Sequence, residues 1–174
     1  GETLTHQESC AEDYFPDPQA THRVFHRGWY HSGDAGYLDD EGHLVFIDRL
    51  ADMRQLADGT RFSPQYIESR LKFSPYIRDV IVIGGEQREF IAAIVSLGFD
   101  NVARWADRRK IYYTTLTDLS QKPEIGELVK KEVEEVNQAL PPNSRIKSLV
   151  NLPQEFDLGE TPTGPAKSRR TLVE

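Results

Sequence analysis

The sequence is poor in cysteine. Cys10 is the only one among 174 residues, which excludes an intrachain disulfide. No Cys-x-x-Cys pair is present and the five histidines are scattered along the chain, so no zinc site is indicated. A single cysteine is usual for proteins of a reducing compartment. We therefore expect a location in the cytoplasm, or at the cytoplasmic face of a membrane.

The chain also has no long apolar run. No stretch approaches the ~20 residues that a transmembrane helix requires, and the N-terminus lacks the pattern of a signal peptide. No transmembrane segment is therefore expected, although peripheral association with a membrane stays open. The net charge is −7, whereas a nucleic-acid-binding protein needs a basic face to replace the counterions of the phosphates. We expect no nucleic acid among its partners.

Apolar patterns become clear only after the first part of the chain. Residues 1–27 are polar and are predicted to be irregular, and a start at Gly1 without methionine indicates the cut end of a longer protein. The acidic turn 39–42 between two apolar runs predicts a β-hairpin. Its second run, 43–48, has apolar side chains at successive positions, which is typical of a strand covered on both faces.

From about residue 50 the pattern predicts a mixed α+β domain. Asp58 and Gly59 mark a tight turn between two short extended pieces, and Ser63 followed by Pro64 predicts a helix start. Asp100 is the expected N-cap of another helix. The remaining expected elements are two paired strands over 79–84 and 90–97, a long amphipathic helix from Pro123, and a last strand over 146–152.

Three polar residues are candidates for a binding or catalytic site. Asp34 follows a Ser-Gly pair, which is typical of a turn, but its carboxylate could also accept both hydroxyls of a ribose. Arg49 is either a solvated charge or, one hairpin away from Asp34, part of a site for a sugar and its phosphate. Lys167, in the segment TPTGPAKSRR, is either a cation of a flexible tail or a charge that enters a closing site.

The order of these motifs resembles the C-terminal part of the adenylate-forming enzymes, which include acyl-CoA synthetases, luciferases and nonribosomal-peptide adenylation domains. The run GWYHSGDAG is similar to the family motif GWxxTGD, GTRFSPQYIES resembles NVSPxEIE, and GETPTGPAKSRR resembles a terminus of the form LTPTxKxRR. The similarity covers almost the whole chain and is greatest to the long-chain fatty acyl-CoA synthetases.

The resemblance implies an α+β fold in which residues 50–174 form a mobile C-terminal lid domain, and residues 1–49 form a β-rich tail of the N-terminal adenylation domain. The implied reaction has two steps. A fatty carboxylate attacks the α-phosphate of ATP, bound with Mg²⁺, to give acyl-AMP, and CoA then displaces AMP to form a thioester. The phosphate-binding loop, the acyl pocket and the Mg²⁺ site would belong to the N-terminal domain, which is the expected partner. Without that domain we expect no activity, and we expect residues 1–49 either to be partly disordered or to form crystal or dimer contacts.

The resemblance also implies a role for five residues. Asp34 would bind the ribose hydroxyls of the nucleotide, and Arg49 would contact the ribose or the phosphate. Ala51 would occupy the hinge on which the lid rotates between the two steps, and Gly59 would lie in the loop that lines the CoA tunnel. Lys167 would be the catalytic lysine of adenylation.

Departures from the family pattern keep other interpretations open. The hinge residue is commonly Asp or Lys, and Ala51 carries no charge. Counted strictly from Thr163, the lysine position falls on Pro165, whereas an insertion of two residues aligns KSRR and restores Lys167; we prefer the second register. One alternative is that the lysine role is lost and the chain is a non-catalytic nucleotide-binding or protein-interaction module. Another is that acyl-AMP is delivered to a carrier protein instead of CoA.

Overall fold

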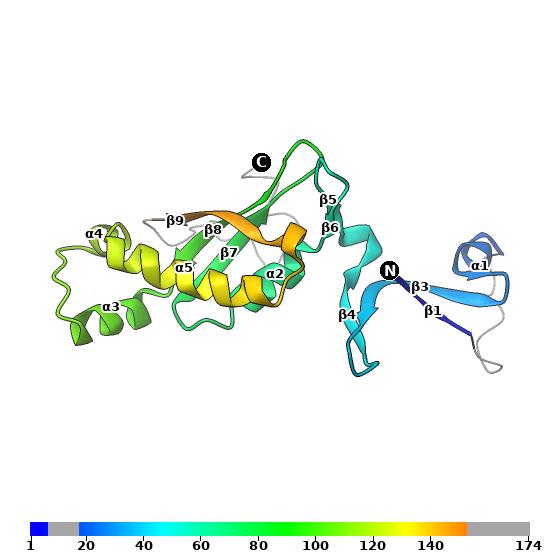
Figure 1. Ribbon diagram of the computed structural model, residues 1–174, viewed down its shortest axis with the longest axis horizontal. Helices are drawn as coiled ribbons and strands as arrows, with labels where there is room; N and C mark the ends of the chain where they lie inside the picture. The colour runs from blue at the N-terminus through cyan, green and yellow to red at the C-terminus, as the bar shows by residue number, and fades with distance from the viewer. Residues whose placement is uncertain (7–17, 153–174) are drawn as a thin grey trace. The chain divides into compact units, whose positions relative to one another are not determined.

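The computed structural model describes residues 1–6 and 18–152 (Figure 1). The chain divides into two compact units, one comprising Gly1–Met53 and the other beginning at Arg54. Each unit has its own β-structure, and the mixed α+β character that the sequence predicts is confirmed.

The first unit is built around one long strand, β3 (Trp29–Leu38). It pairs antiparallel with each of three shorter strands, β1 (Glu2–Thr5), β2 (Phe25–His26) and β4 (Leu44–Arg49). A short helix, α1 (Pro18–Val24), precedes β2, and a single 3-10 turn, η1 (Leu50–Asp52), follows β4.

The prediction that residues 1–27 are irregular was wrong for the described part of that segment, because β1, α1 and β2 occupy it. The strand β1 has a largely polar sequence, and backbone pairing with β3 stabilises it: Glu2 lies opposite Ala35, and Thr5 lies opposite Tyr30. A local pattern cannot reveal a partner so far along the chain. Residues 7–17 lie outside the described residues, and the expectation of partial disorder in residues 1–49 stays a prediction.

The predicted hairpin is confirmed as β3 and β4, but the expectation that both of its faces are covered was wrong. Leu38 lies opposite Leu44 and Gly36 opposite Phe46, so these positions share one face. On that face Leu38 is 68% exposed, Leu44 56% and Phe46 57%. The hairpin therefore presents an apolar face to solvent in this chain.

The second unit contains a three-stranded sheet with β8 (Ile91–Leu97) in the middle. The antiparallel pairing of β7 (Ile77–Ile83) with β8 confirms the predicted pair of strands, and the predicted last strand, β9 (Ile146–Leu152), pairs with β8 in parallel. A parallel neighbour requires a crossover connection. The chain supplies it with α3 (Phe99–Arg108), α4 (Leu116–Ser120), α5 (Pro123–Gln138) and the 3-10 turn η2 (Pro142–Ser144).

Two amphipathic helices cover one face of this sheet. The helix α2 (Pro64–Leu71) packs on β7, α5 packs on β9, and the two helices contact each other (Figure 1). The predicted helix start is confirmed, since the Ser63 hydroxyl accepts a hydrogen bond from the Tyr66 amide at 2.9 Å. The helix α5 buries Ile125, Leu128, Val129 and Val133.

The predicted N-cap of α3 was wrong by two positions. Gly98 occupies the N-cap position, and Asp100 lies in the first turn. The amide of Gly98 donates to the Tyr76 carbonyl at 2.8 Å, and a Cβ at Gly98 would lie 3.0 Å from the Pro75 carbonyl oxygen. This close backbone approach favours glycine and determines where the helix begins.

One carboxylate is buried between a helix and the sheet. Glu68 of α2 is 6% exposed, and its Oε1 accepts a hydrogen bond from the Val82 amide of β7 at 2.9 Å. Because β7 is an edge strand of the described sheet, an amide that points away from β8 has no strand partner. Glu68 satisfies this amide and fixes α2 against the sheet.

We expect Glu68→Ala to lower the free energy of unfolding by about 1–3 kcal/mol, because it leaves a buried amide without an acceptor. Glu68→Gln retains an acceptor oxygen, so we expect it to lower the free energy of unfolding by less than Glu68→Ala does. Denaturant unfolding followed by circular dichroism measures both variants, and equal stability of Glu68→Ala and the unmodified protein would contradict the assignment.

Candidate functional site

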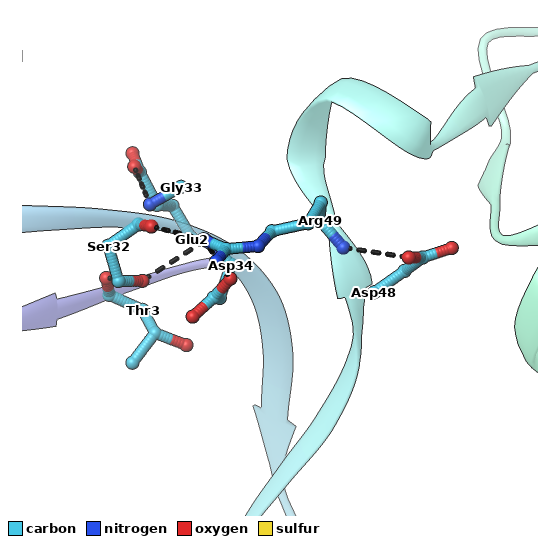
Figure 2. Close-up of polar contacts among 7 residues, drawn as sticks. All are labelled: Glu2, Thr3, Ser32, Gly33, Asp34, Asp48 and Arg49. Carbon is cyan, nitrogen blue, oxygen red and sulfur yellow. Dashed lines mark hydrogen bonds and ion pairs between the residues drawn. The ribbon is translucent and has the colours of Figure 1, made fainter.

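The candidate site begins with the pairing of Asp34 and Arg49. Asp34 on β3 and Arg49 at the end of β4 are directly opposite one another in the antiparallel ladder. The Arg49 Nη1 atom lies 2.8 Å from Asp34 Oδ1, and the same nitrogen donates a hydrogen bond to the Ser32 carbonyl at 3.0 Å (Figure 2). The structure thus brings together two of the candidate residues, as their spacing across one hairpin suggested.

The backbone around Asp34 is held by the neighbouring strand β1. The Ser32 hydroxyl donates to the Thr3 carbonyl at 2.8 Å and accepts a hydrogen bond from the Asp34 amide at 3.1 Å (Figure 2). Between them, Gly33 has φ +71°, a conformation that favours glycine, and its amide donates to a Glu2 carboxylate oxygen at 3.3 Å. These contacts fix the turn of the chain that presents the Asp34 carboxylate.

A second carboxylate holds the other side of the site. Asp48 is buried at 6% exposure, and its Oδ1 accepts a hydrogen bond from the Arg49 amide at 2.8 Å (Figure 2). An irregularity in the β3–β4 register lies here, between Ala35 and Gly36, where the partner shifts from Asp48 to Phe46. Such a bulge increases local twist and re-aims the side chains beside it.

The pair is partly open to a ligand, although the Asp34 Oδ1 atom that faces Arg49 is itself buried. The Arg49 side chain is 63% exposed and that of Asp34 30%. A carboxylate accepts two adjacent hydroxyl donors, and a guanidinium donates two parallel hydrogen bonds to a phosphate. Side by side, the two groups suit a ligand that carries a diol and an anion.

Gly59 lies in the second unit, in the turn between the short antiparallel strands β5 (Arg54–Gln55) and β6 (Arg61–Phe62), as predicted. Its φ is +85°, it is exposed, and its amide donates to the Leu56 carbonyl at 3.0 Å. A side chain at this position would strain the backbone. The turn therefore presents bare backbone at the surface.

Ala51 is the middle residue of η1 and is exposed. Extended residues flank this turn, since Arg49 has ψ 139° and Met53 also has ψ 139°, and no side chain caps it. The first unit ends at Met53.

Lys167 lies outside the described residues, as does the whole TPTGPAKSRR segment. Among the residues that the structure describes, no group of three or more metal-ligating side chains is present, so none is assigned to Mg²⁺. In the same part of the chain, no helix is both long and apolar enough to cross a membrane.

Two residues of the site were not among the sequence candidates. Ser32 is one of them, although the Ser-x-Asp spacing itself predicts a side-chain hydrogen bond to the amide two residues on. Glu2 had no signal, because its contact with Gly33 depends on strand pairing.

Comparison with known proteins adds a family and several relatives. The family model described as AMP-binding enzyme C-terminal domain matches residues 52–165. The long-chain-fatty-acid–CoA ligase FadD15 of Mycobacterium tuberculosis is 29% identical over 178 residues, which cover 100% of this chain and 29% of that protein. Human long-chain-fatty-acid–CoA ligase 1 is 26% identical over 173 residues, 96% of this chain and 25% of that protein. The chain thus spans less than a third of the length of these relatives.

Solved structures share the fold of this chain. The A domain of a carboxylic acid reductase from Segniliparus rugosus, in complex with AMP and a co-purified carboxylic acid, matches with a TM-score of 0.60 at 17% identity, covering 99% of this chain and 26% of that one. The anthranilate CoA ligase AuaEII matches with a TM-score of 0.56 at 19% identity, covering 99% and 29%. At these identities the likeness establishes the fold.

The loop that carries Gly59 offers a test by titration. Hydrogen bonds from Thr60, chiefly from its amide to Asp58 Oδ1 at 2.8 Å, hold the pKa of Asp58 below its ordinary value of 3.8. A lowered pKa in the folded state stabilises the fold above the unfolded pKa, and this contribution is lost as the pH falls through the folded pKa.

Asp58 is therefore expected to titrate below its ordinary pKa of 3.8 in a carbon-detected NMR titration, and the Thr60 amide signal should shift with it. Thr60→Pro removes the amide donor and should return the Asp58 pKa towards its ordinary value. An unshifted pKa in the unmodified chain would contradict the geometry of this loop.

Proposed function

Because the chain belongs to the family of AMP-binding enzyme C-terminal domains, we propose that it is the C-terminal part of a long-chain fatty-acid–CoA ligase. Its substrates would be a fatty acid, ATP and CoA. The observation that carries the proposal is the Asp34–Arg49 pair, because it places a carboxylate acceptor for ribose hydroxyls and a cation for the adjoining phosphate side by side in one partly exposed site. The relatives named as long-chain-fatty-acid–CoA ligases support the choice of substrate.

In the first step, a carboxylate oxygen of the fatty acid would attack the α-phosphorus of ATP, and the bond to pyrophosphate would break. Both reactants are anions, so a cation between them lowers the barrier. We assign this task to Lys167. Asp34 and Arg49 would hold the nucleotide by its ribose and phosphate while the step proceeds. In the second step, the CoA thiolate would attack the acyl carbonyl and AMP would leave.

The proposal assigns residues 1–49 to the tail of an N-terminal domain and residues 50–174 to a lid domain. The division of the chain after Met53 and the start of the family match at residue 52 support a boundary near this point. We propose Ala51 as the hinge, since an exposed single turn between extended residues can change its backbone angles without losing buried contacts. The turn at Gly59 would line the path of the CoA pantetheine arm.

The exposed apolar face of the β3–β4 hairpin supports the N-terminal domain as a partner. Leu38, Leu44 and Phe46 expose more than half of their surface in this chain. Burial of such side chains stabilises a fold by about 1.5–3 kcal/mol each, so a covering domain is favoured. We propose that the N-terminal domain packs on this face.

The two half-reactions test the proposal in the full-length protein. Lys167→Ala should lower the fatty-acid-dependent exchange of labelled pyrophosphate into ATP by about 10²–10³-fold, and leave thioester formation from supplied acyl-AMP and CoA unchanged. Gly59→Ala should lower thioester formation from supplied acyl-AMP and CoA, and it should leave the pyrophosphate exchange unchanged. Arg169→Ala, which removes a cation from the same segment, is the matched control and should affect neither half-reaction strongly.

The outcomes separate the alternatives. Unchanged exchange in Lys167→Ala would remove Lys167 from the mechanism, and absence of exchange in the unmodified protein would favour a non-catalytic module. Product formed with a phosphopantetheinylated carrier protein but not with CoA would favour an acyl-AMP ligase that serves a carrier. The A-PCP didomain of a carboxylic acid reductase is among the similar structures, which makes this second acceptor worth including.

A further inference from the structure

A cluster of cations lies at the C-terminal end of α3, outside the candidate site. Arg104, Arg108, Arg109 and Lys110 are all exposed. Asp107 is the one acidic residue within residues 104–113, so four cations less one anion leave this segment at +3, in a chain whose net charge is −7. We name these four cations, together with Trp105 and Tyr112, the basic end of α3.

The helix orients this cluster away from the core. Val102 and Ala106 of α3 are fully buried, whereas Arg104 and Arg108 lie four residues apart on another face of the helix, and Trp105 and the C-cap residue Arg109 form a second pair at the same spacing. The Arg109 guanidinium lies over the Trp105 ring, 4.0 Å from its centroid. This cation–π contact holds one charge and one aromatic ring together at the surface.

Most cations of this cluster have no acidic partner among the described residues. Within the described part of the chain, Arg104, Arg108 and Lys110 form no ion pair. A cation in the last turn stabilises a helix terminus, which accounts for Arg108. That explanation does not extend to Lys110, which lies beyond the helix with φ +58°.

An exposed aromatic ring follows the cations in the chain. Tyr112, two residues after Lys110, is 88% exposed. Phe73, which is 86% exposed, lies near the other end of the helix, because the Asn101 side-chain amide in the first turn of α3 donates to the Pro75 carbonyl at 2.7 Å. Rings left this exposed are costly in water, and amphipathic rings beside cations are typical of surfaces that lie at a membrane interface.

We propose that the basic end of α3 binds an anionic lipid bilayer. Charge complementarity argues for this occupant, because the negative potential of such a surface attracts nearby Lys and Arg residues. Asp100 of the same helix lies one turn from Arg104 and reduces the attraction locally, whereas acidic residues beyond a Debye length of about 8 Å oppose it only weakly at physiological ionic strength. A groove of about 510 Å³ lies between α5 and β9, and none of the residues at the basic end of α3 lines it.

The proposal is independent of the proposed catalytic function. It gives the chain a peripheral contact with the membrane in which fatty acids dissolve, and it requires no spanning helix. The contact is electrostatic first, with Tyr112 adding apolar area once the surfaces meet.

Vesicle sedimentation of the full chain tests the proposal. The unmodified chain should bind vesicles of phosphatidylcholine and phosphatidylglycerol, should not bind phosphatidylcholine alone, and should dissociate as salt is added. Arg108→Gln combined with Lys110→Gln should weaken binding by about fivefold for each charge removed. Lys130→Gln combined with Lys131→Gln removes the same charge from exposed positions of α5 and should change binding less than twofold, on the order expected for distant charges.

A second variant separates charge from aromatic contact. Tyr112→Ser should weaken binding while the salt dependence is retained. All four altered side chains of the two double variants are exposed, so both variants should stay folded, and only Arg108→Gln should shift the unfolding curve slightly, because it removes a cation from the last turn of α3. Absence of binding to anionic vesicles would overturn the proposal and leave the basic end of α3 for an acidic protein partner. Equal losses in the two double variants would overturn it as well, because net charge alone would then explain the binding.

Discussion

The candidate site depends on one constraint, the antiparallel register of β3 and β4. This register places Asp34 opposite Arg49 and gives the 2.8 Å contact between their side chains. A slip by one residue would send each side chain to the opposite face of the strand and separate the two groups. The bulge near Ala35 and the hydrogen bonds from β1 support the register where the carboxylate is presented. The arrangement thus comes from backbone pairing among β1, β3 and β4.

Much of the fold is encoded in local patterns. The helices α2 and α5 follow from proline at the first helical position and from apolar side chains at helical spacing, and the β7–β8 pair follows from two β-branched runs. Long-range pairing is what the sequence does not display. The strand β1 is largely polar and ordered only by β3, and Gly98 rather than Asp100 begins α3 because of a contact with the chain near Pro75.

The candidate site shows the same contrast between features that a local pattern predicts and features that depend on long-range pairing. Asp34 and Arg49 could be paired in advance because a hairpin places strand residues at predictable positions. The role of Glu2 could not be predicted, since it depends on the strand β1. The role of Glu68 in the fold could not be predicted either, because a buried carboxylate that accepts from an edge amide has the same sequence signature as an exposed one. The assignments of Ala51, Gly59 and Lys167 come from the family resemblance, and nothing in their local sequence would have required them.

The central claim is that Asp34 recognises the ribose hydroxyls of an adenine nucleotide. Calorimetric titration of the full-length protein with AMP and with 2′,3′-dideoxy-AMP tests it most directly, with Asp34→Asn as the variant and Asp39→Asn, on the same hairpin, as the control. The account predicts that the unmodified protein and Asp39→Asn bind AMP roughly 10- to 100-fold more tightly than the dideoxy form, as hydrogen bonds to a charged acceptor allow. Asp34→Asn should lose most of that preference. An unchanged preference in Asp34→Asn would contradict the claim.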